Sequence, residues 1–70
     1  MLKVGEILTV NNNKYTVAST VVKDGQEYVF LVALSNPDET IICLRNNEYL
    51  KIVNDVSLIE ELEFMFSETI

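Results

Sequence analysis

Apolar residues alternate or run together along most of the chain, most clearly in the segment Tyr15–Leu34. Two β-rich runs in this segment are joined by Asp24-Gly25, a dipeptide that is typical of two-residue hairpin turns. The second run contains an unbroken apolar stretch, Tyr28–Leu34. Such a stretch, bounded by turn signals, is typical of a strand whose two faces are both covered. We therefore expect Gln26–Leu34 to be the central strand of a sheet.

Four further segments have the β-branched and aromatic composition of strands. They span Val4–Val10, Tyr15–Val22, Thr40–Arg45 and Glu48–Val53. Asparagine-rich turns follow the first and the third of them, because asparagine tolerates positive φ better than most residues; these turns are Asn11–Asn13 and Asn46-Asn47.

The second strand has polar residues on both faces. Strict alternation places Tyr15, Val17, Ser19 and Val21 on one face and the residues between them on the other. Hydrophobicity therefore sets the register of this strand only weakly, and the Asp24-Gly25 turn must help to fix it.

The apolar pattern near the C-terminus has a helical period. Five residues form a single stripe at spacings i, i+1, i+4, i+7 and i+8: Leu58, Ile59, Leu62, Met65 and Phe66. Asn54 or Asp55 is placed to cap the start of this helix, and Ser57 with Glu60 has the spacing of a capping box. The pattern predicts a C-terminal helix over about residues 55–67.

These elements predict a single α+β domain over residues 1–70. The strands form a five-stranded antiparallel β-meander over about residues 3–53, because tight turns force neighbours in sequence to pair. The sheet is either a twisted open sheet or an SH3-like half-barrel. The helix packs its apolar stripe on one face of the sheet or closes one end of it.

The charge of the chain narrows its choice of partners. Eleven acidic and five basic residues give a net charge of −6, and the basic residues form no cluster. This balance argues against direct binding to nucleic acid or to an anionic membrane surface. A single cysteine, Cys43, forms no intramolecular disulfide, and the N-terminal sequence does not have the pattern of a signal peptide. We expect a cytoplasmic protein.

The chain offers little catalytic chemistry. It has no histidine, two glycines and one cysteine, so zinc-ligand sets, phosphate-binding loops and catalytic triads are not expected. Asp38 and Glu39 are adjacent carboxylates in a loop, and Arg45 shares a strand face with Cys43, where it would lower the pKa of the thiol. A solvated loop and a buried structural cysteine are the simpler interpretations. We expect no cofactor, no metal and no catalytic residue.

One aromatic residue does not fit the buried stripe of the helix. Phe64 lies one turn after Glu60, on the acidic side. Either it packs against an edge of the sheet, or it is an exposed anchor for a protein partner. The candidate interaction residues are Phe64, Glu60, Glu61, Glu63 and Glu68.

Several segments together resemble a known group of small domains. The Asp24–Tyr28 turn leads into Val29-Phe30-Leu31, an acidic loop and Ile41–Arg45 follow, and a helix rich in Glu and Phe ends the chain. Over about residues 14–66 this order is similar to the DUF1292 group of Gram-positive bacteria and their phages. The resemblance implies a bacterial or mobile-element source and a cytoplasmic location, and it carries over no catalytic residues.

Three hypotheses for function follow. The first is a small acidic, non-enzymatic protein-interaction module, either homodimeric or bound to a different protein. The second is a phage-type or mobile-element-type acidic inhibitor that blocks a nucleic-acid-binding protein through Glu60, Glu61, Glu63, Glu68 and Asp55. The third is an enzyme that uses Asp38, Glu39 or Cys43, and it has the least support.

Overall fold

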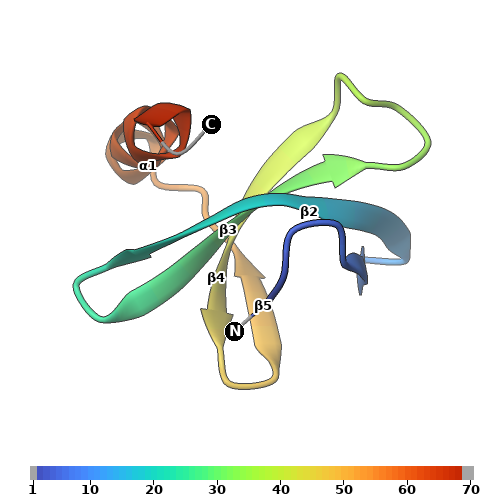
Figure 1. The fold of residues 1–70 in the computed structure, drawn as a ribbon, viewed down its shortest axis with the longest axis horizontal. Helices are drawn as coiled ribbons and strands as arrows, with labels where there is room; N and C mark the ends of the chain where they lie inside the picture. The colour runs from blue at the N-terminus through green and yellow to red at the C-terminus, as the bar shows by residue number, and fades with distance from the viewer. Residues whose placement is uncertain (1, 69–70) are drawn as a thin grey trace.

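The computed structural model describes residues 2–68, which form one antiparallel sheet and one helix (Figure 1). The strands are β1 (Ile7–Val10), β2 (Asn13–Lys23), β3 (Gln26–Ala33), β4 (Thr40–Asn46) and β5 (Tyr49–Ile52), and the helix is α1 (Val56–Glu68). The sheet curls into a half-barrel, so the α+β prediction is confirmed in its curled form. β1 begins at Ile7 rather than Val4, because Glu6 N donates to Lys3 O (3.1 Å) in a turn before the strand.

The strands pair in sequence order, with β3 in the centre of the sheet as predicted. Two of the hairpins have two-residue turns in which both residues have positive φ: Asn11 and Asn12 after β1, and Asp24 and Gly25 after β2. Positive φ at both positions matches the right-handed twist of the flanking strands, which fixes the register of each hairpin.

The turn between β4 and β5 lies one residue later than predicted. Asn46 belongs to β4 and pairs with Tyr49, so the connecting residues are Asn47 and Glu48. Of these two, Asn47 has positive φ (57°) and Glu48 does not. Two consecutive asparagines do not show by themselves which one occupies the first position of the turn.

β3 separates two apolar cores. The inner core fills the curl of the sheet, and its buried members are Val10, Tyr15, Val17, Val29, Leu31, Ala33 and Cys43. The outer core lies on the opposite face under α1, and its buried members are Val21, Tyr28, Ile42, Leu62 and Phe66. Alternate residues of β3 therefore enter different cores, which explains its unbroken apolar sequence.

β2 changes face partway along its length. Val17 and Ser19 pair with consecutive residues of β3, so Ala18 is the extra residue of a β-bulge. The bulge reverses the alternation: Tyr15 and Val17 face the inner core, whereas Ser19 and Val21 face α1. The prediction that these four residues share one face is therefore wrong, because alternation along a sequence does not reveal an extra residue.

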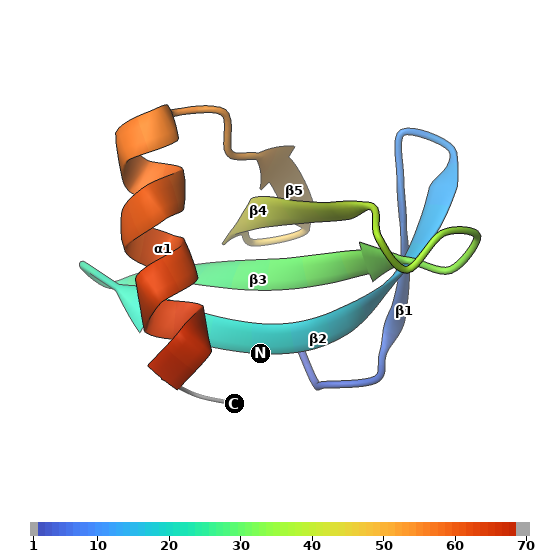
Figure 2. The same ribbon diagram turned by 90° about the horizontal axis from the view of Figure 1, so that it is seen from above.

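α1 begins with a cap from Asp55, whose Oδ1 accepts hydrogen bonds from Ser57 N (3.0 Å) and Leu58 N (3.4 Å). The alternatives, a cap from Asn54 or a capping box from Ser57, are thus decided in favour of Asp55. The helix crosses the strands on the outer face of the sheet (Figure 2). Its predicted stripe faces the sheet, with Leu62 and Phe66 buried.

Candidate interaction surface

Phe64 lies on the side of α1 that faces away from the sheet. Its side chain is 66% exposed, whereas Leu62, two residues earlier and on the opposite side of the helix, is 0% exposed. Phe64 therefore does not pack against an edge of the sheet. Glu60 and Glu68 lie one helical turn before and one turn after Phe64 and are also exposed. The phenyl ring is therefore flanked by a carboxylate on each side along the helix axis.

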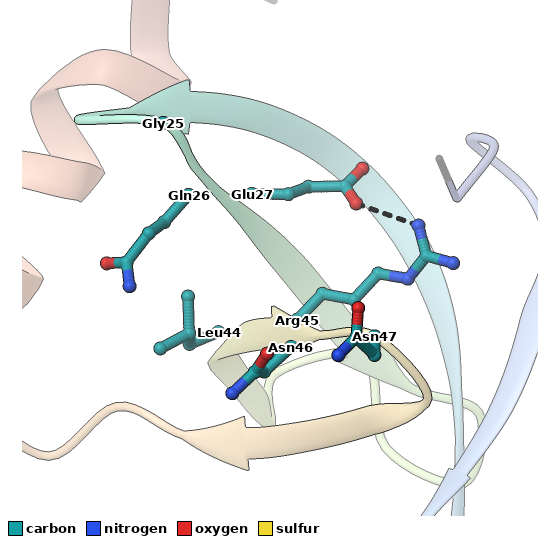
Figure 3. Close-up of a pocket in the computed structure, with 7 residues that line it drawn as sticks. All are labelled: Gly25, Gln26, Glu27, Leu44, Arg45, Asn46 and Asn47. Atoms are coloured by element: carbon teal, nitrogen blue, oxygen red, sulfur yellow. Dashed lines mark hydrogen bonds and ion pairs between the residues drawn. The ribbon is translucent and has the colours of Figure 1, made fainter.

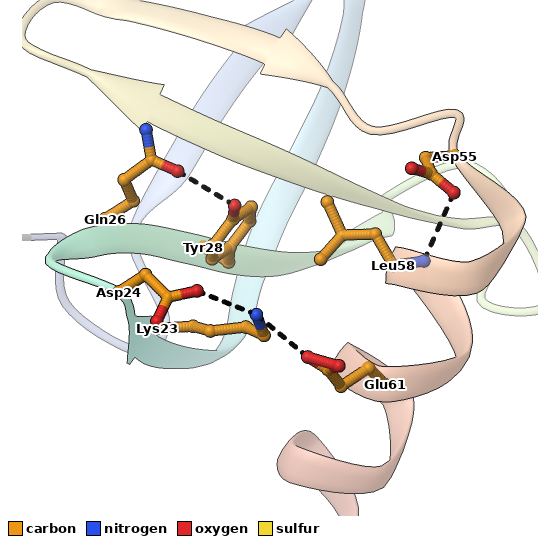
Figure 4. Close-up of polar contacts among 7 residues, drawn as sticks. All are labelled: Lys23, Asp24, Gln26, Tyr28, Asp55, Leu58 and Glu61. Atoms are coloured by element: carbon orange, nitrogen blue, oxygen red, sulfur yellow. Dashed lines mark hydrogen bonds and ion pairs between the residues drawn. The ribbon is translucent and has the colours of Figure 1, made fainter.

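The other carboxylates near α1 point in different directions. Glu61 faces the β2–β3 hairpin, where its Oε2 lies 2.9 Å from Lys23 Nζ, and the same ammonium lies 2.9 Å from Asp24 Oδ2 (Figure 4). These two carboxylates raise the pKa of Lys23 above its usual range, chiefly through their hydrogen bonds. Asp55 is occupied by the helix cap. The five carboxylates of the inhibitor hypothesis are therefore not all brought together on one surface.

Glu63 faces the other side of α1, where the helix and the outer face of the sheet form a groove that is mostly apolar beside Phe66 and of mixed polarity beside Thr40. The groove consists of two hollows of about 190 Å³ each, which share Phe30, Ile42 and Glu63. The first hollow is completed by Thr40, Ile41, Ile52, Val53 and Ile59, and the second by Phe66 and Ser67. Among the lining residues, Glu63 is the one with an ionisable side chain.

A polar hollow of about 390 Å³ lies between the β2–β3 turn and the β4–β5 turn (Figure 3). Within it, Arg45 Nη1 donates to Glu27 Oε1 (3.0 Å), a pair that joins β3 to β4. The second oxygen of this carboxylate, Oε2, is buried and accepts no hydrogen bond from the described residues. Asn46 and Asn47 complete the rim. The hollow is open to solvent, and its ion pair links two strands of the sheet.

The three catalytic candidates lie in two different settings, Cys43 in a buried core and Asp38 and Glu39 in an exposed loop. Cys43 is 0% exposed in the inner core, and this burial raises the pKa of its thiol to about 11. Arg45 is paired with Glu27, and the pKa of the thiol is raised rather than lowered, as expected for the buried structural cysteine that the sequence favoured over an activated one. Asp38 and Glu39 are exposed in the β3–β4 loop, where Asp38 N donates to Asn36 Oδ1 (3.1 Å) in an Asx turn. Residues 2–68 contain no group of three or more potential metal-ligating side chains.

The groove beside α1 was not expected from the sequence. Phe30, Ile42 and Phe66 each occupy an apolar position, as predicted, but their patterns do not show where a helix crosses a sheet. The one available signal is the placement of Glu63 at the border of the apolar stripe, beside Phe66 and Ile59 on a helical wheel.

The chain matches no protein-family model, no curated protein and no solved structure. The resemblance to the DUF1292 group therefore stays a prediction. In the part of the chain that the structure describes, no helix has the length and apolarity needed to cross a membrane.

Proposed function

We propose that this protein is a small, acidic, non-enzymatic interaction module that binds a protein partner through the exposed side of α1. The observation that carries the proposal is the exposure of Phe64, at 66%, on a helix whose opposite side buries Leu62 and Phe66 against the sheet. Exposed aromatic side chains often supply much of the binding energy at protein interfaces, because burying the ring removes a large apolar area from water. Nothing in the core of this domain requires an aromatic residue at this position.

The charge of α1 favours a different protein over a second copy. Its sequence contains four glutamates and no lysine or arginine. Two copies of α1 packed side by side would bring like charges together, which weakens association at low ionic strength. We therefore expect a partner with basic residues around an apolar pocket for Phe64, in a cytoplasmic setting. A homodimer remains an alternative outcome.

Sedimentation equilibrium of the native chain, of Phe64→Glu and of Val56→Glu tests this surface first. Val56 is a matched control, because it is 68% exposed on the same helix. We expect all three to be folded monomers. A native dimer that only Phe64→Glu dissociates would assign the surface to self-association instead.

Partner capture with the same three proteins tests the anchor itself. We expect a specific partner to be retained by the native chain and by Val56→Glu and to be lost with Phe64→Glu. Equal retention by all three would remove Phe64 from the interaction.

The inhibitor of a nucleic-acid-binding protein is the second candidate, and the net charge of −6 supports it. Such a partner would be displaced by nucleic acid, and its binding would fall steeply with salt, because each contact would be between opposite charges. The anchor model predicts a weaker salt dependence, since burial of Phe64 is apolar. Binding at 50 mM and at 500 mM NaCl separates the two.

A further inference from the structure

The groove between α1 and the outer face of the sheet has the size and lining of a side-chain-binding site. Each of its two hollows is about 190 Å³, and a cavity of about 150 Å³ accommodates a benzene ring. Phe30 and Phe66 form part of the wall, with ring centroids 5.5 Å apart. A bulky apolar side chain placed here would displace water from apolar surface, which is favourable.

The sheet offers an open backbone edge beside this groove. β5 ends at Ile52, which pairs with Cys43, and Val53 N donates to Ile42 O (2.8 Å) before the chain leaves the sheet. Backbone groups alternate in direction along an antiparallel strand, so those of Ile41 point toward β3, and Ile42 O already accepts from Val53 N. Thr40 is therefore the residue at this end of β4 whose outward backbone groups face no strand among residues 2–68. An unpaired edge is a template for an additional strand.

Glu63 defines the charge that an occupant needs. Its carboxylate is exposed and takes part in no ion pair within the described residues. Among the described residues, no lysine or arginine lines either hollow. A ligand with a lysine or arginine next to its apolar side chain would complement this carboxylate, whereas an acidic segment would be repelled.

We propose that this groove binds an extended peptide segment of a partner protein, in which an apolar side chain fills a hollow and an adjacent lysine or arginine pairs with Glu63. The segment lies beside Thr40, beyond the end of β5. This site is distinct from the Phe64 surface, because Phe64 lines neither hollow. A second copy of this chain is a less suitable occupant, since each copy carries a net charge of −6.

Nuclear magnetic resonance titration with short peptides tests the proposal. The probe is Ac-Thr-Leu-Lys-Thr-NH2, and its controls are Ac-Thr-Leu-Glu-Thr-NH2 and Ac-Thr-Ala-Lys-Thr-NH2. We expect the first peptide to shift the backbone amide signals of Phe30, Thr40, Ile42 and Glu63 and to bind more tightly than either control. Shifts centred elsewhere, or equal binding of the three peptides, would overturn the proposal.

Two matched variants separate the charge of Glu63 from the general acidity of the helix. Glu63→Gln keeps the shape of the side chain, and we expect it to weaken the lysine peptide by about three- to five-fold, as for an exposed ion pair. Glu60→Gln removes a charge from the outer side of α1, and we expect little change. Equal effects of the two substitutions would contradict a specific role for Glu63.

Phe64→Glu distinguishes this proposal from the proposed function. We expect it to leave the peptide titration unchanged, because the two surfaces are separate. If the peptides do not bind while partner capture still depends on Phe64, peptide binding in the groove is refuted, whereas the interaction module that binds through Phe64 is not. Shifts of the same amides that depend on protein concentration, with no peptide present, would identify a second copy as the occupant and would also refute the proposal.

Discussion

Cys43 illustrates how burial alone decides the chemistry of a residue. Its side chain is fully enclosed in the inner core, on the strand face that it shares with Arg45. A cationic neighbour stabilises a thiolate, but here the guanidinium is engaged by Glu27. Desolvation therefore dominates and favours the neutral thiol. The sequence predicted both the burial and the shared face, and it missed the ion pair, because Glu27 and Arg45 become neighbours only through the pairing of β3 with β4.

The raised pKa of Cys43 predicts a loss of stability at high pH. The pKa is 9.0 in the usual case and about 11 in this fold, so the unfolded chain releases its proton at lower pH than the folded chain. The free energy of unfolding is therefore unaffected by this thiol below pH 9. It falls between pH 9 and pH 11 by up to about 1.4 kcal/mol per pH unit. Urea denaturation across this range measures it, with Cys43→Ala as the reference because tyrosines titrate there too. Identical pH profiles would contradict the prediction.

At the scale of elements, the sequence predicted what local chemistry controls. The Asp24-Gly25 hairpin, the position of β3 and the stripe of α1 are all confirmed, because turn residues and apolar periodicity act over a few neighbouring positions. The bulge at Ala18 was missed for the opposite reason. The bulge lets β2 contribute to both cores. Its usefulness depends on where α1 packs on the sheet, and the sequence of β2 does not indicate that position.

The cap of α1 gives a test at this scale. Asp55→Ala removes the acceptor for two backbone N–H groups of the first turn, so we expect a loss of about 1 kcal/mol in the free energy of unfolding. Ser57→Ala is the matched control, since the serine lies inside the helix and is exposed. Urea denaturation of the two variants measures both losses in the free energy of unfolding. A larger loss for Ser57→Ala would mean that the capping box, and not Asp55, starts the helix.

At the scale of the whole molecule, one sheet supports two cores. The sequence indicated that both faces of β3 are covered, but it left open whether the helix packs on a face or closes an end. That choice sets the candidate surfaces, because the angle at which α1 crosses the strands leaves the groove open beside Glu63 and turns Phe64 toward solvent. A chain of this size buries only about 60% of the surface that it exposes when unfolded. The outer core is therefore a large part of what holds the fold together.

Removal of α1 tests how far the two cores depend on each other. A chain that ends at Asn54 retains all five strands but exposes the outer side of the sheet, including Tyr28 and Ile42. We expect this chain to lose cooperative unfolding, because the inner core alone does not offset the conformational entropy of ordering the meander. Circular dichroism during urea denaturation, together with binding of a hydrophobic dye, measures this loss. A cooperative transition in the shortened chain would instead make the curled sheet an independent folding unit, with α1 added to it as a separable binding element.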